Sequence, residues 1–127
     1  MSIRGLGIDL VEIARIDALL AQHEERFQER VFTSAEVAHS QGRRNRSQHL
    51  AVRFAAKEAA MKALGTGLAQ GVVWQDIEVV TDDAGAPGLV LRGGAAMRAD
   101  ALGINAWHIS LTHTDLVAGA VVVGESR

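Results

Sequence analysis

The spacing of hydrophobic residues along the first part of the chain predicts a strand followed by helices. Residues 3–11 (IRGLGIDLV) mix β-branched and small apolar residues, a composition that favours a β-strand. From residue 12 onward, apolar residues recur at helical spacing and predict a first helix: Ile13, Ile16, Leu19 and Leu20. A second short helix is expected over residues 23–31.

The middle of the chain carries signals for helix ends. Thr33 or Ser34 is a suitable N-cap, since Glu36 follows within the first turn. The stretch HSQGRRNRS contains glycine and asparagine and predicts a loop. A long alanine-rich helix is expected over about residues 47–64, with Gly65 as its C-terminal stop.

The second half of the chain favours strands. The segment VVWQDIEVVTDDAGAPGLVL predicts two strands around a turn at residues 83–87, and a helix is expected over 93–102. NAWHISLTH and LVAGAVVVG predict two more strands joined near Thr114. The last strand is apolar on both faces, so we expect it to be buried or to lie at a subunit interface. This order indicates an α+β fold, with the long helix packed on a mainly antiparallel sheet.

The composition narrows the class of protein. With 127 residues, of which 48% are hydrophobic, the chain suits one compact domain over residues 1–127. It has no cysteine, which excludes disulfides, zinc–thiolate sites and cysteine nucleophiles. No apolar run is long enough to span a bilayer, and the N-terminus lacks the apolar core and cleavage site of a signal peptide. We therefore expect a cytoplasmic protein with no membrane partner.

The net charge of −2 hides a basic segment in the middle of the chain. Residues 39–62 contain six basic residues and one acidic residue, which gives +5 for the segment and −7 for the rest. Such a block indicates an anionic partner, which would be nucleic acid, a phosphate ligand or an acidic protein. The alternative is an ordinary solvated helix face.

Glu58 stands out on the long helix because it lies between Lys57 and Lys62, the only lysines of the chain. At about 100° per residue, its neighbours around the helix are mostly apolar, so its carboxylate should be partly removed from water. A buried charge needs a partner. The simplest candidate is Lys62, one turn further on, in an ordinary ion pair.

Asp9 is a second carboxylate in apolar surroundings, between Ile8 and Leu10 near the end of the first strand. A carboxylate on a buried strand and another on the inward face of a helix would form a site for a hard cation. Mg²⁺ commonly takes one or two protein carboxylates and fills its other positions with water and phosphate oxygens. The alternative for Asp9 is a contact with the N-terminus of the helix that begins near Glu12.

Other sequence motifs are weak. Gly5 and Gly7 begin a G-x-G, but leucine at position 10 breaks the dinucleotide-binding pattern. No serine lies in a nucleophile elbow, so a hydrolase triad is not indicated. His113, at a strand end, is typical of a structural or surface residue, although next to a phosphate it would donate a hydrogen bond.

Four segments together resemble one family. GLGIDLVEIARI, LAVRFAAKEAAMKALGTG, DIEVVTDDAGAP and HISLTHT occur in the order and spacing of the holo-[acyl-carrier-protein] synthases, the small bacterial class of 4′-phosphopantetheinyl transferases. The resemblance runs from Gly5 to the last strand. Ala86 stands where the family often has lysine, and SLTHT replaces SISHT, but neither change touches a charged site position.

This resemblance implies the 4′-phosphopantetheinyl transferase fold and a reaction in fatty acid biosynthesis. The family transfers phosphopantetheine from coenzyme A to a serine of apo acyl carrier protein and releases adenosine 3′,5′-bisphosphate. It implies Mg²⁺ as cofactor and a homotrimer with active sites at the subunit interfaces, and it gives nucleic acid no role.

The resemblance also assigns roles to residues. Asp9 and Glu58 would bind the metal and act in catalysis, with Glu58, or a water that it holds, removing the serine proton. Arg15 and Arg26 match the region where the family docks its acidic carrier. Coenzyme A would be held by four further residues: Lys62, Arg53, His113 and Gly65. Of these, Arg53 points away from Glu58, so it would serve a neighbouring subunit's site or the 3′-phosphate, unless it forms a structural salt bridge.

Two other functions use the same features. A metal-dependent pyrophosphate hydrolase would need the two carboxylates and the basic segment but no protein acceptor. An RNA-binding module would use the basic segment alone, yet the chain has no tyrosine and only Phe54 in that segment for base stacking.

Overall fold

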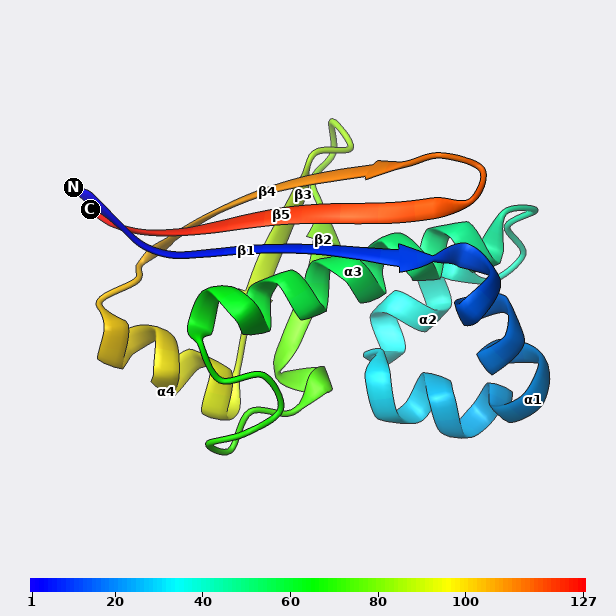
Figure 1. The fold of residues 1–127 in the computed structure, drawn as a ribbon, viewed down its shortest axis with the longest axis horizontal. Helices are drawn as coiled ribbons and strands as arrows, with labels where there is room; N and C mark the ends of the chain where they lie inside the picture. Colours follow the sequence, from blue (N-terminus) through cyan, green and yellow to red (C-terminus); the bar gives the residue numbers. More distant parts are fainter.

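A three-stranded antiparallel sheet lies over one long helix (Figure 1). The computed structural model describes residues 1–127. The strands β1 (Ser2–Glu12), β5 (Val117–Ser126) and β4 (Ala106–His113) pair in the order β1-β5-β4. Ser2 pairs with Ser126, so the two chain ends lie side by side at one end of the sheet.

The central helix α3 (Arg46–Leu64) is apolar around most of its circumference. It packs against strands of both sheets and against α1 (Ile13–Val31) and α4 (Gly93–Leu102), and this explains why its alanines are buried on every side. Gly65 ends it in the left-handed conformation (φ 74°), as the sequence predicted. The predicted start lies one residue after the observed one.

Glycines on β1 allow the strand to touch the backbone of α3. A Cβ atom on Gly7 would lie 1.8 Å from the carbonyl oxygen of Ala59, and one on Gly5 would lie 2.2 Å from that of Ala63. No real side chain tolerates such distances, so glycine is required at both positions. The strand and helix therefore lie in direct main-chain contact, with no side chains between them.

The helices that follow β1 differ slightly from the prediction. The two helices expected before residue 32 form one element, α1, with a kink at His23 (φ −143°, ψ 44°). The short helix α2 (Ser34–Ser40) begins with a capping box, in which Thr33 accepts from the Glu36 amide and Glu36 accepts from the Thr33 amide. Thr33 is thus the N-cap, which confirms one of the two predicted candidates.

The predicted hairpin forms a small sheet of its own. Strands β2 (Ile77–Thr81) and β3 (Pro87–Leu91) pair with each other and follow a single turn of 3₁₀ helix, η1 (Trp74–Asp76). The helix predicted over residues 93–102 is α4. The α+β prediction is confirmed, and none of the helices is both long and apolar enough to cross a membrane.

The exposed apolar surface of the main sheet lies on β1 rather than on β5. The last strand is central, and its inward residues Ala118, Ala120 and Val122 are buried. The large apolar side chains exposed on β1 are Ile3, Leu6, Ile8 and Leu10. The outer face of β1 is therefore the sheet surface most suited to a partner.

Candidate active site

The pleat of β1 turns Asp9 toward α3. Successive side chains of a strand point to opposite faces, so Ile8 and Leu10 face outward while Asp9 lies inward and is buried. The ammonium of Lys62 on α3 donates to the carbonyl oxygen of Ile8 at 2.9 Å and to Asp9 Oδ1 at 3.1 Å. The structure therefore joins the two chain segments that the sequence had singled out.

Glu58 lies beside Asp9, one turn before Lys62. Burial raises the pKa of the Glu58 carboxyl, and the nearby Asp9 carboxylate raises it further. The positive charges of Arg15 and Lys62 act in the opposite direction and lower this pKa. Two carboxyl groups in contact favour either a shared proton or a cation between them.

The two carboxylates fit a hard cation. Asp9 Oδ2 is buried and has no hydrogen-bond partner, so an oxygen ligand is available next to Glu58. No group of three or more acidic, histidine or cysteine side chains that could hold a metal exists in the structure. A Mg²⁺ ion held here would keep most of its coordination positions for water or phosphate oxygens, as this ion prefers.

The structure contradicts the ion pair of Glu58 with Lys62 and a capping role for Asp9. Lys62 pairs with Asp9 and not with its helical neighbour Glu58. Helix α1 begins at Ile13 with Glu12 at the N-cap and no side-chain cap, so Asp9 does not cap it.

Lys57 has a structural role that the sequence did not reveal. It is fully buried on another side of α3, where its ammonium lies 2.6 Å from Glu36 Oε1 and donates to the carbonyl oxygens of Val31 and Trp74. The other carboxylate oxygen of Glu36 accepts from the Val79 amide at 2.8 Å. This network ties α3 to the end of α1, to α2, to η1 and to β2, directly behind Glu58.

A cavity of about 280 Å³ opens beside the carboxylates. Gly65 ends α3 just before the loop that helps to form this cavity. Charged and apolar side chains share its wall, so it suits a ligand with both an anionic and an apolar part. The lining residues are Glu58, Met61, Lys62, Gly67, Leu68 and Trp74.

Comparisons with known proteins show which family the chain belongs to. The family model of the 4′-phosphopantetheinyl transferase superfamily matches residues 5–120. The chain belongs to this superfamily. It is 51% identical to the holo-[acyl-carrier-protein] synthase of Solidesulfovibrio magneticus, over 97% of this chain and 98% of that protein. It is 52% identical to that of Methylobacterium sp. (strain 4-46), over 96% and 93%.

Solved structures of the same superfamily share the fold. The holo-[acyl-carrier-protein] synthase of Neisseria meningitidis superposes with a TM-score of 0.90 at 30% identity, covering 98% of this chain and all of that one. The Bacillus anthracis synthase in complex with CoA (3′,5′-ADP) gives 0.82 at 37% identity, covering 98% of each chain. The predicted family is thus confirmed.

A second cavity has Arg53 in its wall. It has a volume of about 360 Å³ and lies between the β2–β3 turn and β4. Arg53 is buried, and its guanidinium donates to the His49 carbonyl oxygen at 3.3 Å without any ion pair. Burial and then the charges of Arg53 and Arg43 lower the pKa of His49 to about 4, so this histidine is neutral. The structural salt bridge considered for Arg53 is absent.

The other predicted substrate residues lie apart in one chain. His113 is exposed at the end of β4, with Nδ1 3.0 Å from Gln48 Nε2, and it does not line the cavity of Arg53. Arg15 is exposed on α1 and lies over the Phe54 ring, 5.6 Å from its centre. Arg26 is exposed beyond the kink of α1. A single chain therefore brings Asp9, Glu58, Lys62 and Arg15 together. The side chains of Arg53, His113 and Arg26 lie elsewhere on it.

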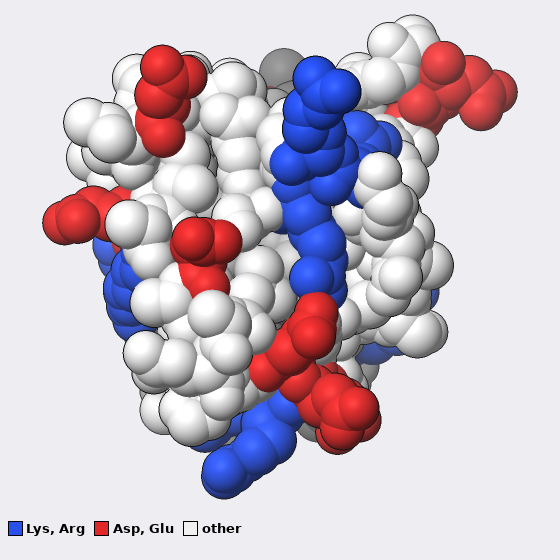
Figure 2. Space-filling view, turned by 90° about the vertical axis from the view of Figure 1, so that its right-hand side faces the viewer, with Lys and Arg blue, Asp and Glu red and all other residues white.

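The basic segment does not form one surface. Lys57 and Arg53 are buried, Lys62 is bound to Asp9, and Arg46 pairs with Glu24 at 2.8 Å. Figure 2 shows a stripe of basic side chains on the end of the molecule that carries α1 and α2, with acidic side chains directly below it. Because three of the six basic residues are buried or bound to Asp9, the argument for an RNA-binding module is weakened.

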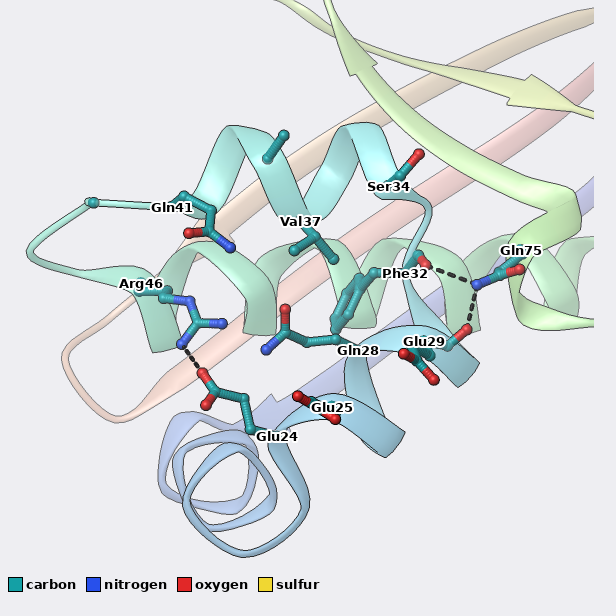
Figure 3. A pocket seen from close by; sticks show the side chains of 12 residues that line it. Glu24, Glu25, Gln28, Glu29, Phe32, Ser34, Val37, Gln41, Arg46 and Gln75 are labelled. Carbon is teal, nitrogen blue, oxygen red and sulfur yellow. Dashed lines mark hydrogen bonds and ion pairs between the residues drawn. The ribbon is translucent and has the colours of Figure 1, made fainter.

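The cavity between α1 and α2 has the wrong charge for phosphate. It has a volume of about 820 Å³ and contains three glutamates, Glu24, Glu25 and Glu29 (Figure 3). Its one basic residue, Arg46, is already paired with Glu24. We therefore place no substrate there.

Proposed function

We propose that this chain transfers the 4′-phosphopantetheine group of coenzyme A to a serine of apo acyl carrier protein. The observation that carries the proposal is the pair of buried Asp9 and half-buried Glu58, with one unpartnered oxygen on Asp9, beside Lys62 and a mixed polar and apolar cavity. The named relatives and the coenzyme A complexes of similar structures support it. The products are holo acyl carrier protein and adenosine 3′,5′-bisphosphate, in a cytoplasmic step of fatty acid biosynthesis.

The residues at the site divide the work of the reaction. The serine oxygen forms a bond to the β-phosphorus, and the bond from that phosphorus to the bridging oxygen breaks. Asp9 and Glu58 would hold Mg²⁺, which supplies charge neutralisation on the diphosphate when bound. Lys62 places its ammonium on a phosphate oxygen, and Glu58, or a water that it holds, accepts the serine proton. Most of the catalysis is positioning and charge stabilisation.

A mass measurement tests the proposal. The protein is incubated with coenzyme A, Mg²⁺ and apo carrier, and the carrier should gain the mass of one phosphopantetheine group. A pyrophosphate hydrolase would release phosphopantetheine without modifying the carrier, and this outcome would refute the transfer reaction.

We further propose a homotrimer in which coenzyme A spans two subunits. The cavity beside Glu58 and the cavity of Arg53 have no lining residue in common, which supports a site shared between chains. In this arrangement a neighbouring subunit supplies Arg53, and His113 also binds phosphate. The exposed row Leu6, Ile8 and Leu10 on β1 supplies an apolar contact surface.

Charging the middle of that row should dissociate the trimer. Ile8→Glu places a carboxylate in an apolar contact, whereas Met97→Glu, at an equally exposed apolar residue on α4, should leave the trimer intact. Light scattering gives the mass of each variant. A wild-type monomer with full transferase activity would contradict the shared site.

Carrier docking should depend on Arg15. Arg15→Glu is expected to lower kcat/KM for the acidic carrier roughly tenfold at low ionic strength, and the loss should shrink as salt rises. Coenzyme A affinity should change little. Arg127→Glu, the same charge reversal at the chain end, is the control, and an equal loss at every salt concentration would indicate a structural role for Arg15 instead.

A further inference from the structure

Lys62 is bound to Asp9, a carboxylate of the proposed metal site. Its ammonium spans from α3 to β1, with acceptors at 2.9 Å on the Ile8 carbonyl and 3.1 Å on Asp9 Oδ1. The side chain itself is 55% exposed, while that of Asp9 is 9% exposed. Lys62 therefore compensates a buried charge without being fixed by packing.

A metal ion and this ammonium would compete for the same carboxylate. A divalent cation on Asp9 and Glu58 would bring a second positive charge onto Asp9, and two cations on one buried carboxylate repel each other strongly. A lysine is a mobile point charge on a flexible stem, so it is free to rotate away. The metal would then take the place of Lys62 as the positive partner of Asp9.

The adjoining cavity gives the displaced ammonium a new position. Lys62 and Glu58 both line the cavity of about 280 Å³, so an anionic group bound there lies within reach of the same side chain. A diphosphate would then attract both the cation and Lys62. Before the diphosphate binds, the cation and Lys62 compete for Asp9. Once it is bound, both positive charges bind this one ligand.

We propose that Lys62 takes the place of the metal on Asp9 in the free enzyme and leaves when the cation binds, so that it opposes metal binding before coenzyme A arrives and no longer opposes it afterwards. This proposal rests on the proposed function, because it takes Asp9 and Glu58 as the metal ligands.

Nuclear magnetic resonance observes the exchange directly. Because the chain has only two lysines, protein labelled with ¹³C-lysine gives two sets of side-chain signals. Mg²⁺ should shift the Lys62 signals and remove the inequivalence of its ε-protons, while those of the buried Lys57 remain as an internal reference. Unchanged Lys62 signals at a Mg²⁺ concentration that saturates binding by calorimetry would overturn the proposal.

Calorimetry of Lys62→Met measures the competition. Without coenzyme A, this variant should bind Mg²⁺ roughly tenfold more tightly than the wild type, and with coenzyme A bound the two affinities should converge to within about threefold. Arg15→Met is the matched control, since Arg15 acts on Glu58 through its charge but does not contact Asp9. Equal tightening by both variants, or the same difference with and without coenzyme A, would mean that Lys62 is only a background charge.

Two further results separate this proposal from the proposed function. If wild-type protein alone binds no measurable Mg²⁺, Lys62→Met must bind it, and the absence of binding in both overturns the exchange. If Asp9→Asn binds Mg²⁺ as the wild type does, the metal site itself is wrong, whatever Lys62 does.

Discussion

Glu58→Gln should lower the rate of phosphopantetheine transfer by about two orders of magnitude or more, the scale of losing a major electrostatic stabiliser. The change keeps the shape of the side chain and removes the negative charge that would bind Mg²⁺. Asp9→Asn should behave alike, and the double variant should be far less than additive, since both carboxylates act through one ion. Mg²⁺-dependent transfer to an apo carrier measures this directly.

The free energy of unfolding provides the control for this prediction. In chelator, Glu58→Gln should be as stable as the wild type or more stable, because burial and Asp9 already disfavour the charged form of Glu58. Loss of activity together with loss of stability would point to a damaged fold. Near wild-type turnover would falsify the role of Glu58 at the metal.

Lys57→Met should lower the free energy of unfolding by about 3–5 kcal/mol, the usual cost of leaving one partner of a buried ion pair alone. The substitution strands Glu36, which is 2% exposed. Lys62→Met makes the same chemical change at a half-exposed lysine and should cost less, because solvent already screens its pairing with Asp9. Urea denaturation in chelator compares the two variants.

The double variant Lys57→Met/Glu36→Gln tests the cause. Removing both charges together should recover part of the lost stability, because no uncompensated buried charge is left. Losses that simply add would show that Lys57 contributes through packing rather than through Glu36.

Local signals in the sequence were sufficient for most elements of the fold. The N-cap at Thr33 and the stop at Gly65 are set by neighbouring residues, so a pattern over a few positions predicts them. The kink at His23 lies where the second helix was predicted to begin, whereas the exposed face of β1 depends on long-range packing. In β1 the inward positions 5 and 7 carry glycine, because the closeness of α3 leaves no room for a side chain there. The exposed apolar residues Leu6, Ile8 and Leu10 alternate with the inward positions on the outer face.

The same division applies to the site. Asp9 and Glu58 could be predicted as partners because two carboxylates in apolar surroundings both need a cation. The partners of the lysines could not, since Lys57 pairs with Glu36 and Lys62 with Asp9, across 21 and 53 positions of the chain. Helical spacing indicates only neighbours on the same helix, and here tertiary contacts decide both pairings.

The direct contact of β1 with α3 means that the main chain determines how far apart the two carboxylates of the proposed site lie. Asp9 follows Gly7 by two residues, and Glu58 precedes Ala59 by one, so each carboxylate starts from backbone that touches its neighbour at the Gly7–Ala59 contact. The distance between the two carboxylates, the proposed metal ligands, is then set by peptide geometry and not by the shapes of core side chains. Substitutions elsewhere in the core can therefore accumulate without changing the distance between the Asp9 and Glu58 carboxylates. A single added methyl group at Gly7 would change it, because it would collide with the carbonyl oxygen of Ala59.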